Sequence, residues 1–334
     1  MRAVFLDFDT VGPGDLDTSA LLQHLPGLEL YAHTPDNDVA ERIAGAAAVL
    51  INKVRLDAQT LAQAEDLRVV CLAATGTDNI DLDAAREHGI AVCNIRDYCT
   101  PSVVQHVFAL ILALTNHLGE YRELLRGRAW ADSAQFCLLD FPIRELAGKT
   151  LGIVGLGALG RGVAAVAGAF GMQGLAARRP YRGAGRDPVA AGPETHAAVE
   201  RVAFDDLLRR AHVVSLHCPL TLDTEKLIDA AALAQMRDDA LLINTARGGL
   251  IDSAELVAAL RDGLIAGAGI DVLRQEPPAD PEPLLDADLP NLIVTPHIAW
   301  AAREARQRAI DEMAENVAAF LRGEQRNRVE LIDA

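Results

Sequence analysis

The sequence lacks several features that mark secreted, membrane-bound and nucleic-acid-binding proteins. Its five cysteines are odd in number and show no C-x-x-C spacing, which argues against a disulfide framework or a zinc site. The start of the chain has no signal-peptide pattern, and the most apolar run, residues 107–114, is too short to span a bilayer. Basic residues are outnumbered, because 31 Lys and Arg face 47 Asp and Glu, a formal net charge of −16. This balance argues against nucleic-acid and anionic-membrane partners. We therefore expect a cytoplasmic protein with reduced thiols, no bound metal and small-molecule ligands.

Apolar segments typical of strands alternate with helical patterns over most of the 334 residues, a length sufficient for two domains. In the first part of the chain these segments are residues 4–8, 28–33, 48–52, 69–73 and 90–94. In the later part they are residues 151–154, 172–177, 213–217, 240–244, 266–271 and 292–295. A long helix is expected from Thr100 to about Arg128, and a last one over residues 301–321. The alternation predicts an α/β fold with parallel sheets covered on both faces.

The clearest motif is a glycine turn that follows the apolar segment 151–154. Gly155, Gly157 and Gly160 have G-x-G-x-x-G spacing, with Ala158 and Leu159 between them, and small apolar residues then continue at helical spacing. Such strand–turn–helix sequences bind dinucleotides, because the first glycine permits the turn, the second admits the pyrophosphate and the third lets helix pack on strand. The N–H groups that begin the helix would hold the pyrophosphate. The alternative interpretation is a glycine-rich packing turn without a ligand.

A motif near the start of the chain also admits two interpretations. Asp7 and Asp9 lie in Phe5-Leu-Asp-Phe-Asp-Thr10, which resembles the strand-end D-x-D of haloacid-dehalogenase-type phosphatases. In the alternative, both residues form a turn that leads into residues 11–14, where Gly and Pro end regular structure. We favour the turn, because the rest of the chain suits a dinucleotide.

Three ionisable residues follow predicted strands of the second half. Arg247 lies in Asn244-Thr-Ala-Arg-Gly248, Glu276 precedes Pro277-Pro278, and His297 ends Thr295-Pro-His297. The ligand crevice of an open α/β sheet lies at the carboxyl ends of its strands, so all three are candidates for catalysis. Taken singly, each has a structural explanation: a helix cap for Arg247, a plain loop for Glu276 and a core histidine for His297.

Taken in order, these motifs resemble those of the D-isomer-specific 2-hydroxyacid dehydrogenases. The resemblance covers nearly the whole chain and rests on the glycine turn and on residues 217–221, 244–248, 269–272, 276–278 and 295–297. Within the family, residues 74–79, 136–142 and 296–300 look most like glycerate dehydrogenases, also called hydroxypyruvate reductases. The resemblance implies two doubly wound parallel-sheet domains: a flavodoxin-like substrate domain from residues 1–99 and 297–334, and a Rossmann cofactor domain from residues 100–296. It further implies hydride transfer between NAD(P)H and a small 2-oxo acid in the cleft, from hydroxypyruvate or glyoxylate to D-glycerate or glycolate.

The resemblance also implies roles for particular residues. His297 would protonate the carbonyl oxygen, which suits a side chain that titrates near neutral pH, and Glu276 would hold its other ring nitrogen. Arg247 would hold the carboxylate and carbonyl oxygens of the substrate with its planar fork. Further substrate contacts would come from Asn52, Lys53, Thr75, Gly76 and Thr77. Besides the glycine turn, cofactor contacts would come from Cys218, Pro219, Thr224, Thr245, Ala246 and, at the nicotinamide carboxamide, Asp271.

The end of the second strand of the cofactor domain departs from the family pattern. Where many members carry Asp or Glu, this chain has Arg178 followed by Arg179. A carboxylate there accepts a hydrogen bond from the ribose 2′-OH of NAD, whereas an arginine can hold the 2′-phosphate of NADP. We therefore expect NADP to be the preferred cofactor, with NAD possible. The alternative is that both arginines are solvated surface charges. Gln105-His106 stands where many members carry Glu-His, and nothing in the sequence explains that change.

Two other functions suit the same architecture. A formate dehydrogenase would need no proton transfer, and by resemblance that subgroup lacks the histidine–glutamate pair. A catalytically idle, NADH-sensing corepressor would need no active-site residues, whereas this chain has Arg247, Glu276 and His297. The long apolar helix that begins at Thr100 indicates a homodimer.

Overall fold

The fold is taken from a computed structural model that describes residues 1–12, 14–178, 199–279 and 281–331. The chain divides into two compact units: Met1–Cys99 together with Trp300–Ala334, and Thr100–Ala299. The second boundary therefore lies three residues beyond the expected position, since residues 297–299 belong to the second unit. Their backbone N–H groups all bond to Asp271: that of His297 to its carbonyl oxygen, and those of Ile298 and Ala299 to its carboxylate.

The first unit contains a five-stranded parallel sheet in the order β2-β1-β3-β4-β5. Its strands are β1 (Ala3–Phe5), β2 (Leu28–Leu30), β3 (Ala48–Ile51), β4 (Val69–Leu72) and β5 (Ala91–Cys93). The helices are α1 (Ser19–His24), α2 (Val39–Ile43), α3 (Ala58–Gln63), α4 (Leu82–Glu87) and α12 (Arg303–Leu321). This strand order is the flavodoxin-like one, in which the crossovers change direction at β1.

Alternate side chains of this sheet enter two separate cores. Val4, Val49 and Val70 pack with α2, α3 and α4 on one face, and Leu50 and Cys71 pack with α1 and α12 on the other. Because both faces are covered, the strands are continuous apolar runs in the sequence rather than alternating ones.

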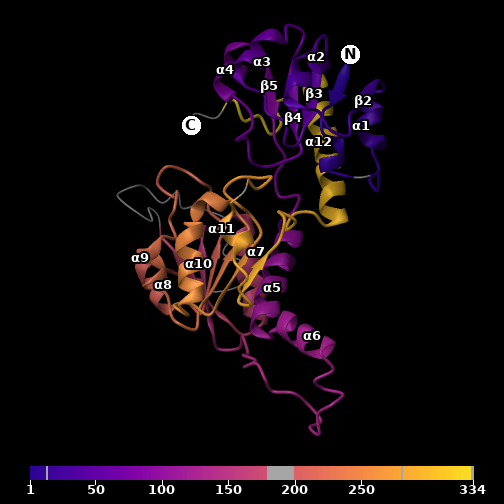
Figure 1. Ribbon diagram of the computed structural model, residues 1–334. Coiled ribbons are helices and arrows are strands. Elements are labelled where there is room, and N and C mark those ends of the chain that lie inside the picture. The colour runs from indigo at the N-terminus through magenta and orange to yellow at the C-terminus, as the bar shows by residue number, and fades with distance from the viewer. Residues whose placement is uncertain (13, 179–198, 280, 332–334) are drawn as a thin grey trace. The chain divides into compact units, whose positions relative to one another are not determined.

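The second unit contains a seven-stranded parallel sheet in the order β12-β11-β10-β9-β6-β7-β8. Its strands are β6 (Thr150–Val154), β7 (Gln173–Ala177), β8 (Glu200–Val202), β9 (Val213–Leu216), β10 (Leu241–Asn244), β11 (Gly267–Ile270) and β12 (Leu292–Val294). On one face α5 (Thr100–Thr115) packs with α7 (Ala158–Ala169) (Figure 1). On the other lie α8 (Phe204–Arg210), α9 (Ala230–Leu233), α10 (Ser253–Arg261) and α11 (Pro283–Asp286). The order is the doubly wound dinucleotide-binding order with one more strand. The predicted fold class, two parallel α/β sheets, is confirmed.

The long helix expected from Thr100 to about Arg128 is instead two helices, α5 and α6 (Leu118–Arg126), which meet at an angle of 55°. The side chains of Thr115 and Asn116 bond back to the carbonyl oxygens of Ile111 and Leu112, at 2.8 and 3.0 Å. His117 then adopts a left-handed conformation with a φ of 53°. Side chains that bond to the preceding turn compete with helical hydrogen bonds, which explains the break.

No single helix in the described ranges is long and apolar enough to cross a membrane. Only α5 and α6, taken together as one bent pair, are long and apolar enough to do so. Seven side chains of α5, from Val103 to Leu114, are buried.

Candidate functional site

The glycine turn lies where the strand order of the second sheet reverses, between β6 and β9. Gly155, directly after β6, has a φ of 103°, and a Cβ there would lie 2.6 Å from the backbone nitrogen of Cys218. A Cβ on Gly160 would lie 2.2 Å from the carbonyl oxygen of Gly155, whereas a Cβ on Gly157 would meet nothing within 4 Å. Packing therefore requires the first and third glycines, and the second leaves open space at the start of α7.

The start of α7 suits an anionic group. Gly157 is the N-cap of this helix and has no side chain that could accept a hydrogen bond from the first turn. The first N–H groups of a helix have no intrahelical acceptor, and together with the positive end of the helix dipole they bind phosphate. The residues present therefore fit the pyrophosphate of a dinucleotide.

Two buried polar atoms at the carboxyl edge of the same sheet have no hydrogen-bond partner in the described part of the chain. They are Oγ1 of Thr245, which follows β10, and Nδ1 of His217, which follows β9. Nε2 of His217 lies 2.8 Å from Oγ of Ser215, and burial lowers the pKa of this imidazole to about 4. The ring is therefore neutral at neutral pH. Buried polar groups are nearly always paired, so these two atoms indicate a polar ligand at this edge.

The other residues predicted to contact the cofactor lie on the loops after β9 and β10. Cys218 is buried beneath the glycine turn, and Pro219 beside it is exposed. The hydroxyl of Thr224 donates to the carbonyl oxygen of Pro219 at 2.8 Å and accepts from the N–H of Thr221 at 2.7 Å, so it is used within its own loop. The N–H of Ala246 donates to the side chain of Asn244.

Arg178 directly follows β7 and is exposed. Its backbone N–H donates to Val202 of β8 at 2.8 Å, which fixes its backbone at the carboxyl edge of the sheet. A hydrogen bond from Arg210 lowers the pKa of nearby Glu200, and the positive charge of Arg178 adds to that shift. Arg179, with the loop that follows it, lies outside the described residues.

Glu276 and His297 are in direct contact on the loops that follow β11 and β12. Nδ1 of His297 lies 2.5 Å from Oε2 of Glu276, and Oε1 of Glu276 accepts the N–H of Leu273 at 2.8 Å. Both side chains are partly exposed, at 27% for His297 and 33% for Glu276. The glutamate is therefore fixed to its own loop while it holds one nitrogen of the ring.

Asp271 anchors the turn that carries His297. Its carboxylate is buried and accepts the hydroxyl of Thr295 at 2.6 Å and the N–H groups of Ile298 and Ala299 at 2.9 Å. His297 itself has a φ of 55°, a conformation that costs energy in a residue with a side chain. Asp271 was expected to face the nicotinamide carboxamide, and in this structure its oxygens hold the backbone of the histidine turn.

Two residues that the sequence did not place in the site complete this anchor. Oγ1 of Thr295 accepts from Nε2 of His106, on α5, at 3.0 Å while it donates to Asp271. Nε2 of His106 also lies 3.4 Å from the carboxylate of Asp271. Thr295 belongs to a motif already noted for its histidine, whereas His106 stood out in the sequence only as part of Gln105-His106, a departure from the family pattern that the sequence did not explain.

Arg247 lies on a tight turn between β10 and α10. The side chain of Asn244 accepts from Ala246 and donates to the carbonyl oxygen of Arg247 at 2.9 Å, which closes the turn. A Cβ on Gly248 would lie 2.0 Å from the carbonyl carbon of Leu273. The absence of that Cβ lets the turn that carries Arg247 pack directly against Leu273, in the loop after β11 that also carries Glu276.

The residues predicted to bind substrate in the first unit lie on two loops that are joined to each other. Asn79 donates to the carbonyl oxygen of Val54 at 2.8 Å, which ties the loop of Asn52 and Lys53 to that of Thr75, Gly76 and Thr77. These loops follow β3 and β4, which are neighbours in the sheet. Asn79 was not among the expected site residues, although it ends the motif of residues 74–79.

The second unit thus holds an anion-binding turn and a histidine–carboxylate pair on the same edge of one sheet. An oxidoreductase that reduces a carbonyl group requires both components: a site for the dinucleotide that supplies the hydride, and a proton donor for the carbonyl oxygen. Residues 108–299 match the family described as D-isomer specific 2-hydroxyacid dehydrogenase, NAD binding domain. The chain belongs to this family.

Individual relatives agree with that assignment. A glycerate dehydrogenase from Methylorubrum extorquens is 46% identical over 297 residues, which covers 89% of each chain. A hydroxypyruvate reductase from Blautia hydrogenotrophica is 36% identical over 326 residues, 97% of this chain and 98% of the relative. Among solved structures, an acyclic imino acid reductase (Bsp5) in complex with NADPH and D-Arg has a TM-score of 0.83 and 26% sequence identity. The match covers 98% of this chain and 100% of the reductase chain.

Proposed function

We propose that the protein catalyses reversible hydride transfer between a nicotinamide cofactor and a small 2-oxo acid, with hydroxypyruvate and glyoxylate as substrates and D-glycerate and glycolate as products. The observation that carries the proposal is the 2.5 Å contact between His297 and Glu276, on the sheet edge that also bears the glycine turn. The names of the two curated relatives support the substrate class.

The bound nicotinamide would supply the hydride that reaches the carbonyl carbon. His297 donates Nδ1–H to Glu276, so we assign Nε2 as the atom that gives its proton to the carbonyl oxygen. Glu276 thereby fixes the orientation of the ring and directs Nε2 to the substrate. In the reverse direction the neutral ring takes the proton from the hydroxyl group. Arg247 holds the substrate carboxylate, and the contributions of Asn52, Lys53, Thr75, Gly76 and Thr77 remain predictions.

The test is the oxidation of reduced cofactor after addition of hydroxypyruvate, glyoxylate and larger 2-oxo acids to the wild type. His297→Ala should lower kcat about 10²–10⁴-fold, the usual contribution of a positioned general acid, with cofactor affinity unchanged. Glu276→Gln keeps the shape and loses the charge, and should lower the reduction rate about ten- to a hundredfold. A wild-type rate in His297→Ala would remove the histidine from the mechanism. Cofactor reduction by formate, without activity on 2-oxo acids, would favour the formate dehydrogenase alternative.

We further propose that NADPH is preferred over NADH. An arginine at position 178 cannot accept the hydrogen bond of a ribose hydroxyl but can hold a phosphate, and the structurally similar imino acid reductase binds NADPH. One charge-assisted hydrogen bond is worth about 1.5–3 kcal/mol, so a preference of about ten- to a hundredfold is expected. Arg178→Asp should reverse or erase it in kcat/KM with the two cofactors. An equal or better efficiency of the wild type with NADH would contradict the proposal.

We propose a cytoplasmic homodimer that associates through the segment after α6. Residues 127–143 contain no helix or strand and extend away from the rest of their unit (Figure 1). Four large apolar side chains on this segment are well exposed: Trp130 at 52%, Phe136 at 90%, Leu139 at 83% and Ile143 at 56%. Exposed apolar groups of this kind mark protein interfaces. The wild type should have the mass of a dimer in light scattering, and Phe136→Glu with Leu139→Glu should yield monomers. A monomeric wild type would refute this part.

A further inference from the structure

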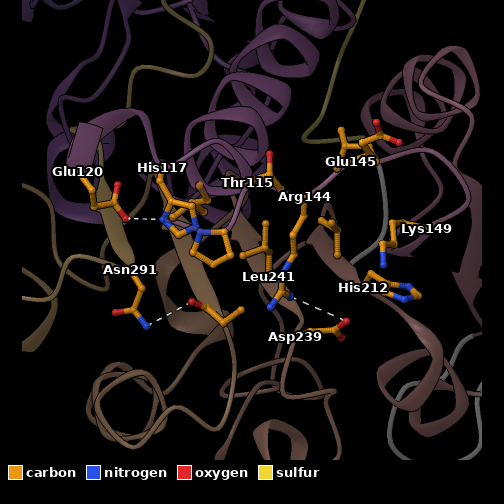
Figure 2. A pocket seen from close by; sticks show the side chains of 15 residues that line it. Thr115, His117, Glu120, Arg144, Glu145, Lys149, His212, Asp239, Leu241 and Asn291 are labelled. Carbon is orange, nitrogen blue, oxygen red and sulfur yellow. Dashed lines mark hydrogen bonds and ion pairs between the residues drawn. The ribbon is translucent and has the colours of Figure 1, made fainter. Parts of the chain in front are cut away.

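A cavity of about 240 Å³ opens at the opposite edge of the second sheet, away from the strand ends that bear the catalytic residues (Figure 2). Its floor comes from residues that begin or directly precede strands: Lys149 before β6, His212 before β9, Leu241 in β10, Ala266 before β11 and Asn291 before β12. Its other side comes from the end of α5, from His117 and Glu120, and from Pro142 and residues 144–146. Because the sheet is parallel, this cavity cannot belong to the site described above.

One side of the cavity carries positive charge that is not neutralised by close contacts. Lys149 forms no ion pair with any residue in the described ranges, and the guanidinium of Arg144 forms no hydrogen bond there. The nearest carboxylate oxygen to Arg144 belongs to Asp239, 4.0 Å away. Arg237 already holds both oxygens of Asp239, at 2.7 and 3.3 Å, so Asp239 offsets little of the charge on Arg144.

His212 adds an N–H donor on the same side, next to Lys149 (Figure 2). Its Nδ1 accepts the backbone N–H of Thr150 at 3.1 Å, which makes Nε2 the protonated nitrogen of the neutral ring. Burial lowers the pKa of His212, and the positive charges of Arg237 and Lys149 lower it further, while the carboxylate of Asp239 acts in the opposite direction. The neutral ring therefore presents its Nε2–H as a donor beside Lys149.

Most of the rest of the lining is apolar or already paired. The exception is Glu145, which is exposed and whose carboxylate points away from Lys149, Arg144 and His212 (Figure 2). Leu114, Leu146, Val213 and Leu241 provide aliphatic surface. At the far side Glu120 accepts from Nδ1 of His117 at 2.8 Å, and the amide of Asn291 donates to two carbonyl oxygens at 3.3 Å. A second negative charge on a ligand would meet Glu120 there. The lining therefore suits one anionic group joined to an apolar body.

We propose that this cavity binds a small aliphatic monocarboxylate, with its carboxylate held by Lys149, Arg144 and the N–H of His212 and its apolar body against the leucines. None of these residues is placed to recognise a 2-oxo or 2-hydroxy group on the ligand. The ligand can therefore be one of the enzyme's own acids or an unrelated carboxylate of similar size, and the proposal does not rest on the catalytic one.

The test is calorimetric titration of the full-length protein with 4-methylpentanoate, which has no group that can exchange a hydride. Binding should be detectable at millimolar concentrations and should weaken at least about tenfold in Lys149→Met and in Arg144→Met, because each removes a charge-assisted bond. Arg261→Met removes an exposed charge from α10 and should leave binding unchanged. Arg247→Ala should also leave it unchanged. A dicarboxylate of similar length, such as adipate, should bind more weakly.

A second readout comes from histidine NMR. The pKa of His212 should rise when 4-methylpentanoate binds, since a nearby anion favours the charged ring. Parallel titrations of Arg247→Ala with the 2-hydroxy and 2-oxo forms of the acid distinguish the two sources of ligand: equal affinities mean any aliphatic acid, and a preference for these forms means the enzyme's own. Absence of binding by the wild type, binding that is lost in Arg247→Ala, or full binding by Lys149→Met would each overturn the proposal.

Discussion

The two sheets share a topological feature that they use in opposite ways. Each strand order reverses once, between β1 and β3 in the first unit and between β6 and β9 in the second. In the first unit the crevice at this point is closed by Asp7, a buried residue just after β1, whose carboxylate accepts the N–H groups of Asn52, Lys53 and Val54 at 2.6–3.0 Å. In the second unit the corresponding position is Gly155, and the turn that follows leaves open space at Gly157.

In the first crevice a side chain of the chain itself accepts the backbone N–H groups, whereas in the second no side chain does. Backbone N–H groups meet at the carboxyl ends of parallel strands and need an anionic or polar acceptor. The first unit supplies its own acceptor, so Asp7 is a structural residue, as the turn interpretation of the D-x-D motif expected. The second unit has no side-chain acceptor at the start of α7, and our proposal is that a phosphate of the cofactor takes that place. A substitution that adds a carboxylate should therefore close the second crevice, and one that removes the carboxylate of Asp7 should open the first.

The largest effect is expected from Gly157→Asp, which gives the second crevice an internal carboxylate. The backbone of Gly157 is extended, with a φ of −82°, and a Cβ has open space, so the fold should tolerate the change. Aspartate at an N-cap stabilises a helix by about 1 kcal/mol, so the melting temperature should hold or rise. Cofactor affinity should fall about a thousandfold, because two charge-assisted bonds to phosphate are lost. Gly157→Ala, which adds no charge, should lose much less. Affinity within tenfold of the wild type would show that the pyrophosphate lies elsewhere.

The reverse change, Asp7→Asn, should open the first crevice at a cost in stability. The amide would place its NH₂ group against N–H donors that now face a carboxylate. The free energy of unfolding should fall by about 3–4 kcal/mol, since hydrogen bonds to a charged group contribute about 1.5–3 kcal/mol each. Exposed Asp9 is the matched control, and Asp9→Asn should change stability by less than about 0.5 kcal/mol. Urea denaturation measures the free energy of unfolding of both variants. Equal losses of this free energy would mean that Asp7 is not the acceptor that closes the crevice.

A third effect concerns pH, through the buried histidine beside the glycine turn. The folded-state pKa of His217, about 4, is below its ordinary value of 6.5, so the unfolded chain binds a proton more readily between these values. Stability should therefore fall as the pH drops from 6.5 to 4, by at most about 3 kcal/mol from this residue. His217→Gln should remove that part of the pH dependence. His88→Gln, at an exposed position, should not. Identical pH profiles of stability for His217→Gln and the wild type would refute this origin.

The smallest effect is expected from Thr245→Val, which removes a hydroxyl that has no partner within the described residues. Unfolding free energy should stay the same or rise slightly, because no hydrogen bond is lost from the folded chain. Cofactor affinity should fall about fivefold, the equivalent of one hydrogen bond of about 1 kcal/mol. Thr224→Val is the contrasting control: its hydroxyl accepts from Thr221 and donates to Pro219, so stability should fall. Unchanged cofactor affinity in Thr245→Val would exclude the hydroxyl as a ligand contact.

Local patterns predicted much of this molecule because they report on strands buried on both faces. Apolar runs such as residues 48–52 and 69–73 lie within about one residue of β3 and β4. The short edge strand β8 was missed, since only one of its three residues is buried and no apolar run marks it. The break between α5 and α6 was also missed, because it depends on side chains that bond back to the preceding turn.

The sequence by itself determined the fold class and the glycine turn, and it singled out Arg247, Glu276 and His297 as candidates for catalysis, because each depends on residue type and short-range spacing. Only the tertiary structure decided that Asp271 holds the histidine turn together with Thr295 and His106, and that Asp7 closes the first crevice. It also placed the charged cavity at the starts of the strands. These features join residues that are distant along the chain, such as His106 and Thr295, which are 189 positions apart. Hydrogen bonds across such distances follow from which strands become neighbours, and no local pattern records that choice.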